Sequence, residues 1–599
     1  MDRPSPNQKR LAQALILLVA ACTLFWQYPQ LQFTHDELSA LYKTELPTFS
    51  QLIEKGVKIE GHPAGVEVFL YYYAPLVNYQ LWALKLPFSL MALASILIIF
   101  AIGRTIKQEA AALYTGAIMA VSQYFIYYGQ IVRPYEVGLF FSLLSALYWL
   151  RYFHEKAHYK NLIGFAAAAA AAAYSHQFSL LLVGIMGLHA LIIASRKGKV
   201  EWLFCGLLTF LLYLPHLNIF FHQLTLGGVG SWLAKPKLSF PISYLAYIFH
   251  FSYLFIAAVL IALLIPKWQL KKAKNWEGLI WFSASFLIGF FYSRQINPVL
   301  QYSTLLFAAP LLLLSIFALR QMRLQWLSLL LIIGTGIYSL YAERHHYPLV
   351  YESAFKYPRD YAALKNLSNS AVITNLDQGK WDFYARLDDY KSDKNYYYQG
   401  PKKLAKYLDT SAQSELVLAL DHNGPSFIPT IIGEYGFNQI HKEDHLGFTL
   451  FHFAKNQKPR ATKPKVASFL EGIRCKAGQD YCGQVTLQLN ANVIEGGQDF
   501  VLAHFKLAEV PQHSNAQLII AYFSEGKLIY WSNRPLTEFQ SGSSFSAFHS
   551  QVLPVAWQQY KSLEARAMIE TKGELMLLEK LSLSLIEGNN QIYGINQPF

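Results

Sequence analysis

Charged residues are scarce in this sequence. Asp, Glu, Lys and Arg make up 15% of its 599 residues, whereas about a quarter is usual for a soluble protein. The scarcity is concentrated between residues 11 and 342, where apolar runs alternate with short polar connections; the rest is mixed and rich in turns. A single soluble globular chain is therefore excluded. The pattern predicts roughly 340 residues in a lipid bilayer and roughly 250 in water.

A basic surface of the kind that binds nucleic acid is also lacking. The net charge is +13, but Lys and Arg cluster in the short connections between apolar runs, where the orientation of membrane helices accounts for them. No basic stripe interleaved with aromatic residues marks a soluble face. We therefore expect no nucleic-acid partner.

No cleavage site follows the first apolar run. Lys9 and Arg10 precede this run, as in a secretory signal, but it ends in Tyr28-Pro29-Gln30 rather than in small residues. The sequence therefore predicts a retained first span, with the N-terminus in the cytoplasm.

The apolar runs predict a protein that crosses the membrane about eleven times. These runs are 11–30, 83–103, 110–128, 135–152, 161–175, 178–194, 200–221, 242–265, 276–292, 301–319 and 324–342. If they alternate in direction, every basic cluster of this half falls on the cytoplasmic side. Segment 64–80 is also apolar, but it is short and contains Glu67 and Pro75. We interpret it as a juxtamembrane or re-entrant helix on the outer face, which places the C-terminal half outside.

Cysteine is scarce too, with four residues in the whole chain. Cys22 and Cys205 lie within predicted spans, where small core residues are expected. Cys475 and Cys482 enclose a short loop in the soluble half, and in an oxidising compartment they would form a disulfide. Half of a zinc site is the alternative, but no second ligand pair stands at a suitable spacing.

The soluble half changes its pattern near residue 460. Residues 343–455 predict a small α/β domain, with a helix at 357–367 and buried strands at 371–376 and 415–420. Residues 456–466 are basic and contain two prolines, and we expect a linker there. Residues 467–599 predict an antiparallel β-sandwich, with strands at 485–490, 500–507, 517–523, 528–533, 546–553 and 580–586. Such a module can bind carbohydrate, but its Tyr530 and Trp531 are as readily explained as core residues.

Two adjacent carboxylates, Asp36 and Glu37, follow the first span. On an outer loop such a pair can bind a cation, or one carboxylate can take a proton from a hydroxyl nucleophile. The structural alternative is a helix cap, in which Thr34 caps the helix and Glu37 completes the capping box. Both interpretations stay open.

Two further outer loops carry isolated polar residues. Gly61-His62-Pro63 begins a helix that contains Glu67, and a simple turn explains this motif equally well. Arg133-Pro134-Tyr135-Glu136 lies between two spans, and Arg133 is the one basic residue of its loop, against the positive-inside trend. Its anionic partner would be a lipid headgroup, Glu136 or a substrate phosphate, which a guanidinium binds bidentately.

Three weaker features also lie on the outer face. Tyr174-Ser175-His176 forms a tight turn between two spans. Loop 222–241 contains Gly227-Gly228-Val229-Gly230 and Lys235, a combination that suits a phosphate or a mobile flap. Arg294, Asn297 and Gln301 line the last outer mouth.

Taken together, four of these motifs resemble those of the GT-C glycosyltransferases. They are Asp36-Glu37 after the first span, His62-Pro63, Arg133-Pro134-Tyr135 and Tyr174-Ser175-His176. The sequence is most similar to the bacterial family related to protein O-mannosyltransferases and to the lipid A aminoarabinose transferases. The resemblance covers roughly residues 10–342, in order and at matching loop positions.

The resemblance implies a GT-C fold and an inverting transfer of a sugar from a polyprenyl-phosphate donor to an acceptor hydroxyl. Asp36 would be the catalytic base, and Glu37 would support it or help to hold a divalent cation. Arg133 and Lys235 would neutralise the leaving lipid phosphate. We expect four further residues to line the substrate pocket: His62, Glu67, Tyr135 and His176.

This sequence departs from its relatives at two places. Many of them have Arg-Tyr near the start of the late span, where this chain has Gln301-Tyr302. The aminoarabinose transferases carry a lysine near His62-Pro63, and no lysine stands there in this chain.

The resemblance also implies a location and partners. We expect a bacterial inner-membrane protein with periplasmic C-terminal domains, and a lipid, protein or glycan as the acceptor. Two other functions are considered: a transporter or flippase for a lipid-linked saccharide, and a non-enzymatic envelope scaffold. A transporter would place polar groups near the bilayer midplane and show internal repeats, and neither is found in the sequence. A scaffold leaves the Asp-Glu and Arg-Pro-Tyr loops unexplained.

Overall fold

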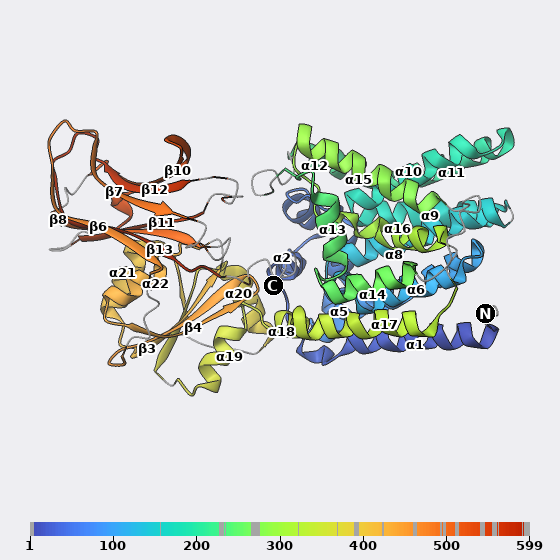
Figure 1. Ribbon diagram of the computed structural model, residues 1–599, viewed down its shortest axis with the longest axis horizontal. Helices are drawn as coiled ribbons and strands as arrows, with labels where there is room; N and C mark the ends of the chain where they lie inside the picture. Colours follow the sequence, from blue (N-terminus) through green and yellow to red (C-terminus); the bar gives the residue numbers. More distant parts are fainter. Residues whose placement is uncertain are drawn as a thin grey trace. The chain divides into compact units, whose positions relative to one another are not determined.

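The chain forms two compact units, residues 1–351 and 352–594. We describe each by itself, from a computed structural model. Figure 1 draws the first unit in blue to yellow-green and the second in yellow to red. The described residues are 5–155, 157–226, 233, 235–264, 276–320, 323–367, 369–388, 395–421, 424–458, 464–490, 494, 499–509, 514–539, 545–553, 557, 560, 562–589 and 591.

The first unit is helical throughout. Its longer helices are α1 (Pro6–Phe25), α5 (Leu81–Thr105), α6 (Glu109–Val121), α8 (Pro134–His154), α9 (Tyr159–Ser175), α10 (Gln177–Ile193), α11 (Arg196–Tyr213), α14 (Tyr253–Leu264), α15 (Glu277–Gln295), α16 (Ala309–Leu319) and α17 (Trp326–Tyr338). Shorter helices are α2 (His35–Tyr42), α3 (Phe49–Gln51), α4 (Gly65–Leu76), α7 (Gln123–Gln130), α12 (Leu217–Thr225), α13 (Phe240–Ile248) and α18 (His346–Tyr351). Each of the eleven predicted runs is largely helical.

Judged by length and composition alone, fewer than eleven of the described helices are long and apolar enough to cross a membrane. Within the described residues there are four, at 6–30, 81–105, 196–225 and 326–343, or five if the bent pair α13–α14 is one span. Three further apolar helices are shorter, at 109–121, 177–193 and 303–319. The chain is thus a multi-pass membrane protein, and the number of eleven spans stays a prediction.

The predicted span at 242–265 is broken in the structure. Helices α13 and α14 meet at an angle of 92°. The backbone at His250 and Phe251 has positive φ angles of 63° and 56°, which no helix can continue through. The break is held from outside, because the Gln123 backbone N–H donates to Nε2 of His250 at 2.6 Å.

Small residues allow close helix packing in the first unit. The alanine run 166–173 lies in α9, which packs on α8, and Ala166, Ala169 and Ala173 are buried. Cys205 is buried as predicted, but Cys22 is exposed on the surface of α1, so the prediction of a core position is wrong for Cys22.

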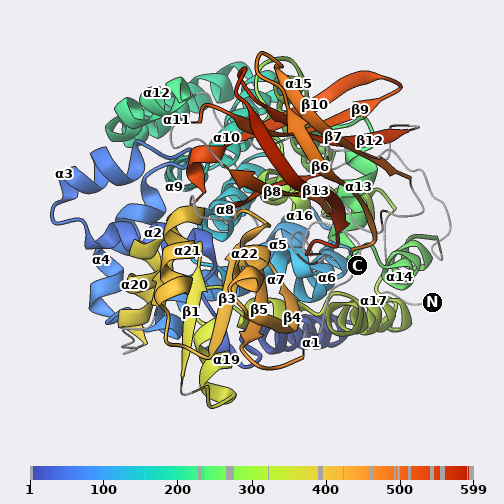
Figure 2. The same ribbon diagram turned by 90° about the vertical axis from the view of Figure 1, so that its left-hand side faces the viewer.

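The second unit begins with a mixed sheet flanked by helices. The strand order is β2-β1-β3-β5-β4, with β2 and β3 parallel to β1 and with β5 antiparallel to β3 and β4. Strands β1, β3, β5 and β4 lie side by side in Figure 2. The elements are α19 (Tyr357–Leu364), β1 (Ser370–Thr374), α20 (Gln378–Leu387), β2 (Asn395–Tyr397), α21 (Pro401–Thr410), β3 (Glu415–Asp421), α22 (Ile428–Glu434), β4 (Asn438–His445) and β5 (Phe448–Ala454).

An antiparallel sandwich follows in the same unit. Its sheets have the orders β10-β9-β12-β7 and β11-β8-β13-β6. The strands are β6 (Val466–Cys475), β7 (Tyr481–Leu489), β8 (Phe500–Glu509), β9 (Gln517–Ser524), β10 (Lys527–Pro535), β11 (Phe545–Val552), β12 (Leu563–Glu570) and β13 (Met576–Ile586). The two predicted modules share one continuous hydrophobic core, to which Leu418 and Phe453 contribute from the mixed sheet and Phe505 and Leu581 from the sandwich.

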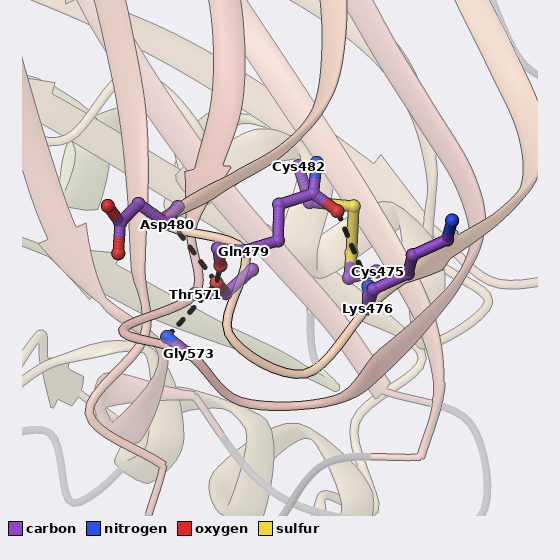
Figure 3. Close-up of a disulfide and its surroundings, with 7 residues drawn as sticks. All are labelled: Cys475, Lys476, Gln479, Asp480, Cys482, Thr571 and Gly573. Atoms are coloured by element: carbon purple, nitrogen blue, oxygen red, sulfur yellow. Dashed lines mark hydrogen bonds between the residues drawn. A yellow bond between two sulfur atoms is a disulfide. The ribbon is translucent and has the colours of Figure 1, made fainter.

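The predicted disulfide joins Cys475 to Cys482, whose Cα atoms are 5.5 Å apart (Figure 3). Cys475 ends β6 and Cys482 lies at the start of β7, so the bond connects strands of different sheets. Thr571 holds the enclosed turn, since its backbone N–H donates to the carbonyl oxygen of Asp480 at 2.8 Å.

Replacing Cys475 and Cys482 by Ser should lower the free energy of unfolding of the second unit by about 2–3 kcal/mol, because a loop of about eight residues is no longer closed. Denaturant unfolding of the full chain in detergent measures this effect. Cys22→Ser, which changes an exposed, unpaired cysteine, is the control and should leave the midpoint unchanged. Equal midpoints for the double variant and the native protein would contradict a stabilising role of the bond.

Candidate active site

The two adjacent carboxylates have separate surroundings because a capping box fixes the start of α2. The hydroxyl of Thr34 accepts from the Glu37 backbone N–H at 3.3 Å, and the Thr34 N–H donates to Oε2 of Glu37 at 2.8 Å. This turns Glu37 inward, where its side chain is 0% exposed, and leaves Asp36 with 70% of its side chain accessible. Of the two, Asp36 is the carboxylate that a ligand can reach.

Glu37 is fully occupied by protein groups. Its Oε1 lies 2.5 Å from Nζ of Lys85 on α5 and accepts from the Val132 backbone N–H at 2.8 Å. Its Oε2 is taken by Thr34. Both oxygens therefore have protein partners, and neither faces the accessible side of Asp36.

The surroundings of Asp36 favour its charged form. The His35 imidazole, whose Nδ1 lies 3.8 Å from Oδ1 of Asp36, lowers the pKa of Asp36 to about 2; burial opposes this shift and the nearby Arg133 guanidinium adds to it. Asp36 is consequently ionised throughout the physiological pH range.

Arg133 stands at the N-cap position of α8, beside Asp36. Its Nη1 donates to the Asp36 carbonyl oxygen at 3.3 Å, and its Nε is buried without a hydrogen-bond partner. The side chain is 6% exposed, and among the described residues it forms no ion pair. Glu136, one of the partners considered from the sequence, instead accepts from the Ser95 hydroxyl at 2.7 Å. A buried guanidinium thus keeps donor capacity for an anion.

Three of the predicted pocket residues come together next to Arg133. The ring centroids of His62 and His176 are 5.2 Å apart, and that of Tyr135 lies 6.0 Å from His62 and 5.7 Å from His176. Burial and the charge of Arg133 lower the pKa of His62 and bring that of His176 to about 3. Both imidazoles are therefore neutral near pH 7 and add no positive charge beside Arg133.

Close packing of α4 against the end of α9 brings His62 to this position. A Cβ atom at Gly65 would lie 2.6 Å from the Tyr174 carbonyl oxygen, so only glycine permits this approach. The Ala64 N–H donates to Nε2 of His216 at 2.9 Å, and the side-chain amide of Gln223 donates to the His62 carbonyl oxygen at 2.6 Å.

Glu67 lies one turn further along α4. It is 2% exposed, and its Oε2 has no hydrogen-bond partner within the described part of the chain. Burial raises the pKa of Glu67, opposed by the charges of Lys43 and Arg133. Lys43 itself pairs with Glu60.

Other predicted residues are not brought to this cluster. Lys235 is exposed and has no polar or charged contact recorded among the described residues; Gly227–Gly230 lie outside them. Arg294 Nη1 donates to the Pro236 carbonyl oxygen at 3.3 Å. No group of three or more His, Cys, Asp or Glu side chains in the described chain is arranged to hold a metal ion.

Lys85 is the residue of this region that the sequence reasoning missed. It is 1% exposed near the start of α5, inside a run assigned as an apolar span. An isolated lysine at membrane depth is costly and tends to be functional, so its presence in that run was the available signal. Its partner Glu37 could not be identified without the fold.

The second unit contains a cavity of about 510 Å³, lined in part by Asp421, Glu434, Phe451, Leu502 and Ile586. None of the predicted catalytic or pocket residues lies there. The cavity is separate from the chemistry described above, and we assign it no role.

Comparisons with known proteins support the resemblance stated from the sequence. Residues 61–219 match the family model described as dolichyl-phosphate-mannose-protein mannosyltransferase. The matched segment contains His62, Glu67, Arg133, Tyr135 and His176 but not Asp36. Over that segment the chain is similar to the protein mannosyltransferases that the family model describes. No curated protein sequence gives a significant match.

Three of the solved structures similar to the chain have the following scores. ArnT from Cupriavidus metallidurans bound to undecaprenyl phosphate is 10% identical, with a TM-score of 0.46 over 75% of this chain and 98% of that one. The Saccharomyces cerevisiae Pmt1–Pmt2 complex bound to the sugar donor is 16% identical, with a TM-score of 0.29 over 37% and 36%. An Archaeoglobus fulgidus oligosaccharyltransferase is 8% identical, with a TM-score of 0.37 over 76% and 74%.

Gly65→Ala should destabilise the first unit by about 1–3 kcal/mol, because the added methyl group forces α4 away from the Tyr174 carbonyl group. The measurement is the melting temperature of the purified protein in detergent. Gly61→Ala is the matched control, since no atom lies within 4 Å of a Cβ at that position. Equal melting temperatures for the two variants would contradict the close approach of α4 and α9.

Proposed function

We propose that this protein is an inverting membrane glycosyltransferase that moves a sugar from a polyprenyl-phosphate donor to an acceptor hydroxyl on the extracytoplasmic face. One observation carries the proposal: an accessible, ionised carboxylate at Asp36 lies beside the unpaired guanidinium of Arg133. The family match over residues 61–219 supports it.

Asp36 is the proposed general base. It accepts the proton of the acceptor hydroxyl as that oxygen attacks the anomeric carbon of the donor sugar. The bond between the anomeric carbon and the phosphate oxygen breaks, and the polyprenyl phosphate leaves with the electron pair. Attack from the face opposite the leaving group inverts the configuration.

Arg133 is the proposed phosphate ligand. Negative charge grows on the phosphate as it leaves, and a donor already fixed in a buried position stabilises that charge without reorganising. The unpartnered Nε and the absence of an ion pair among the described residues leave Arg133 able to make this contact. Lys235, which has no contact with the cluster, is not part of the proposal, and no step depends on a cation.

The neutral side chains next to Arg133 suit a sugar. His62, His176 and Tyr135 offer ring faces and hydrogen-bonding groups without adding charge. Oε2 of the buried Glu67 has no hydrogen-bond partner among the described residues and is available to a sugar hydroxyl. We propose these four residues as the lining of the sugar pocket. Glu37 has a structural place instead, because both of its oxygens are occupied.

The expected location is a bacterial inner membrane, with the second unit in the periplasm. The basic connections of the first unit support this orientation, and the Cys475–Cys482 disulfide fits an oxidising compartment. The acceptor hydroxyl belongs to a lipid, a protein or a glycan.

Asp36→Asn should lower kcat by about 10²-fold or more, because the amide cannot take up the acceptor proton. Transfer is measured with purified protein and a synthetic polyprenyl-phosphate sugar. The control is Glu45→Gln, an exposed carboxylate nine residues along the same loop, and it should keep native turnover. Undiminished transfer by Asp36→Asn would remove Asp36 from the catalytic role.

Arg133→Gln should lower kcat/KM for the donor by about 10²–10³-fold, as expected when one preorganised donor to a developing charge is removed. Arg294→Gln removes an exposed guanidinium that, within the described part of the chain, contacts the Pro236 carbonyl oxygen and the Phe290 ring. It should have little effect in the same donor titration. If the two variants behave alike, the phosphate contact of Arg133 is refuted.

A further inference from the structure

The Glu37–Lys85 ion pair is the most deeply buried in the described chain. The two side chains are 0% and 2% exposed, and Nζ lies 2.5 Å from Oε1. Every other ion pair among the described residues has at least one side chain more than 2% exposed. Lys85 also lies 5.4 Å from the centre of the Phe33 ring.

Stability alone does not explain such a pair. Removing two charges from water is costly, and a buried ion pair is often no more stabilising than apolar residues of the same volume. A contribution other than stability, such as fixing one geometry, would account for its presence.

Three separate segments meet at the two charges. Thr34 binds Oε2 of Glu37 and thereby fixes the first turn of α2, which carries Asp36. The Val132 N–H binds Oε1, and Nζ of Lys85 donates to the Gln130 carbonyl oxygen at 3.1 Å. The third segment is α5 itself, which supplies Lys85.

The segment next to Arg133 is also held from its other side. The Gln130 side chain shares a hydrogen bond with Nε2 of His346 at 2.9 Å and donates to the Leu24 carbonyl oxygen at 3.0 Å. Residues 130–132 are therefore fixed by α1, α5 and α18 as well as by Glu37. One residue beyond this anchored stretch stands Arg133.

We propose that Glu37 and Lys85 form a positioning pair that sets Asp36 and Arg133 at their working separation. Glu37 is adjacent in sequence to Asp36, and its partner Val132 is adjacent to Arg133, so a single carboxylate connects the backbones of both groups. Neither member of the pair touches the substrate. The inference rests on the proposed transfer reaction, in which Asp36 serves the attacking hydroxyl and Arg133 the leaving phosphate.

A double-mutant cycle separates positioning from stability. Lys85→Met and Glu37→Gln are compared with the double variant for melting temperature, kcat and donor KM. The single variants should melt lower, Lys85→Met most, because it leaves a buried carboxylate unpaired. The double variant should regain most of the melting temperature, keep kcat at least tenfold below native and shift donor KM less than threefold.

A return of kcat to the native value together with the melting temperature would overturn the proposal. The pair would then only support the fold. If Lys85→Met does not fold, Glu37→Gln and the double variant still give this comparison. The control is the partly exposed Lys9–Glu109 pair, whose charged atoms are 2.8 Å apart near the N-terminal end of α1. Lys9→Met combined with Glu109→Gln should leave kcat unchanged.

Hydrogen exchange keeps the inference distinct from the proposed function. Amides of residues 35–42 should exchange at least tenfold faster in the double variant than in the native protein, whatever reaction is catalysed. Native protein that fails to use a polyprenyl-phosphate sugar would refute the proposed function alone. Unchanged exchange in these residues would refute the positioning pair.

Discussion

A carboxylate removed from water needs a cation or a hydrogen-bond donor for each oxygen, and Glu37 takes these partners from three parts of the chain. Thr34, Lys85 and Val132 are far apart in sequence, yet each can satisfy Glu37 only from one position. The high cost of an unsatisfied buried charge makes this arrangement hard to distort. The geometry around Asp36 and Arg133 depends on that constraint.

The electrostatics of the site depend on which side chains are charged and which of the charged ones lack an ion-pair partner among the described residues. Burial keeps His62 and His176 neutral, so the cluster beside Arg133 contributes hydrogen bonds but no further positive charge. Asp36 remains ionised and accessible, whereas its sequence neighbour is buried and paired. A region with one available cation and one available base is chemically suited to a reaction in which a hydroxyl loses its proton and an anion leaves.

Local patterns in the sequence predicted much of this structure. Hydrophobic period and turn residues are local properties, so the helical runs, six sandwich strands and the cysteine pairing followed from them. The break in 242–265 did not, because a hydrogen bond from Gln123 holds His250 in a non-helical conformation. No strand was predicted at β6, since much of its surface is exposed and its residues lack clear alternation. The candidate residues could be predicted from the outer loops. The different roles of Asp36 and Glu37 could not, because they depend on the contact of Glu37 with Lys85, which is distant in sequence.

The length of the short helix α4 affects the whole chain, because the number of membrane crossings decides on which side each later loop lies. It has twelve residues, which as a helix are about 18 Å long, and a bilayer core is about 30 Å thick. Each crossing reverses the side on which the following chain emerges, so one additional span would exchange the compartments of all later loops. Arg133 would then face away from the side of Asp36, and the two cysteines of the sandwich would stand in the reducing cytoplasm. The length of a single helix thus couples the assembly of the site to the compartment in which the second unit folds.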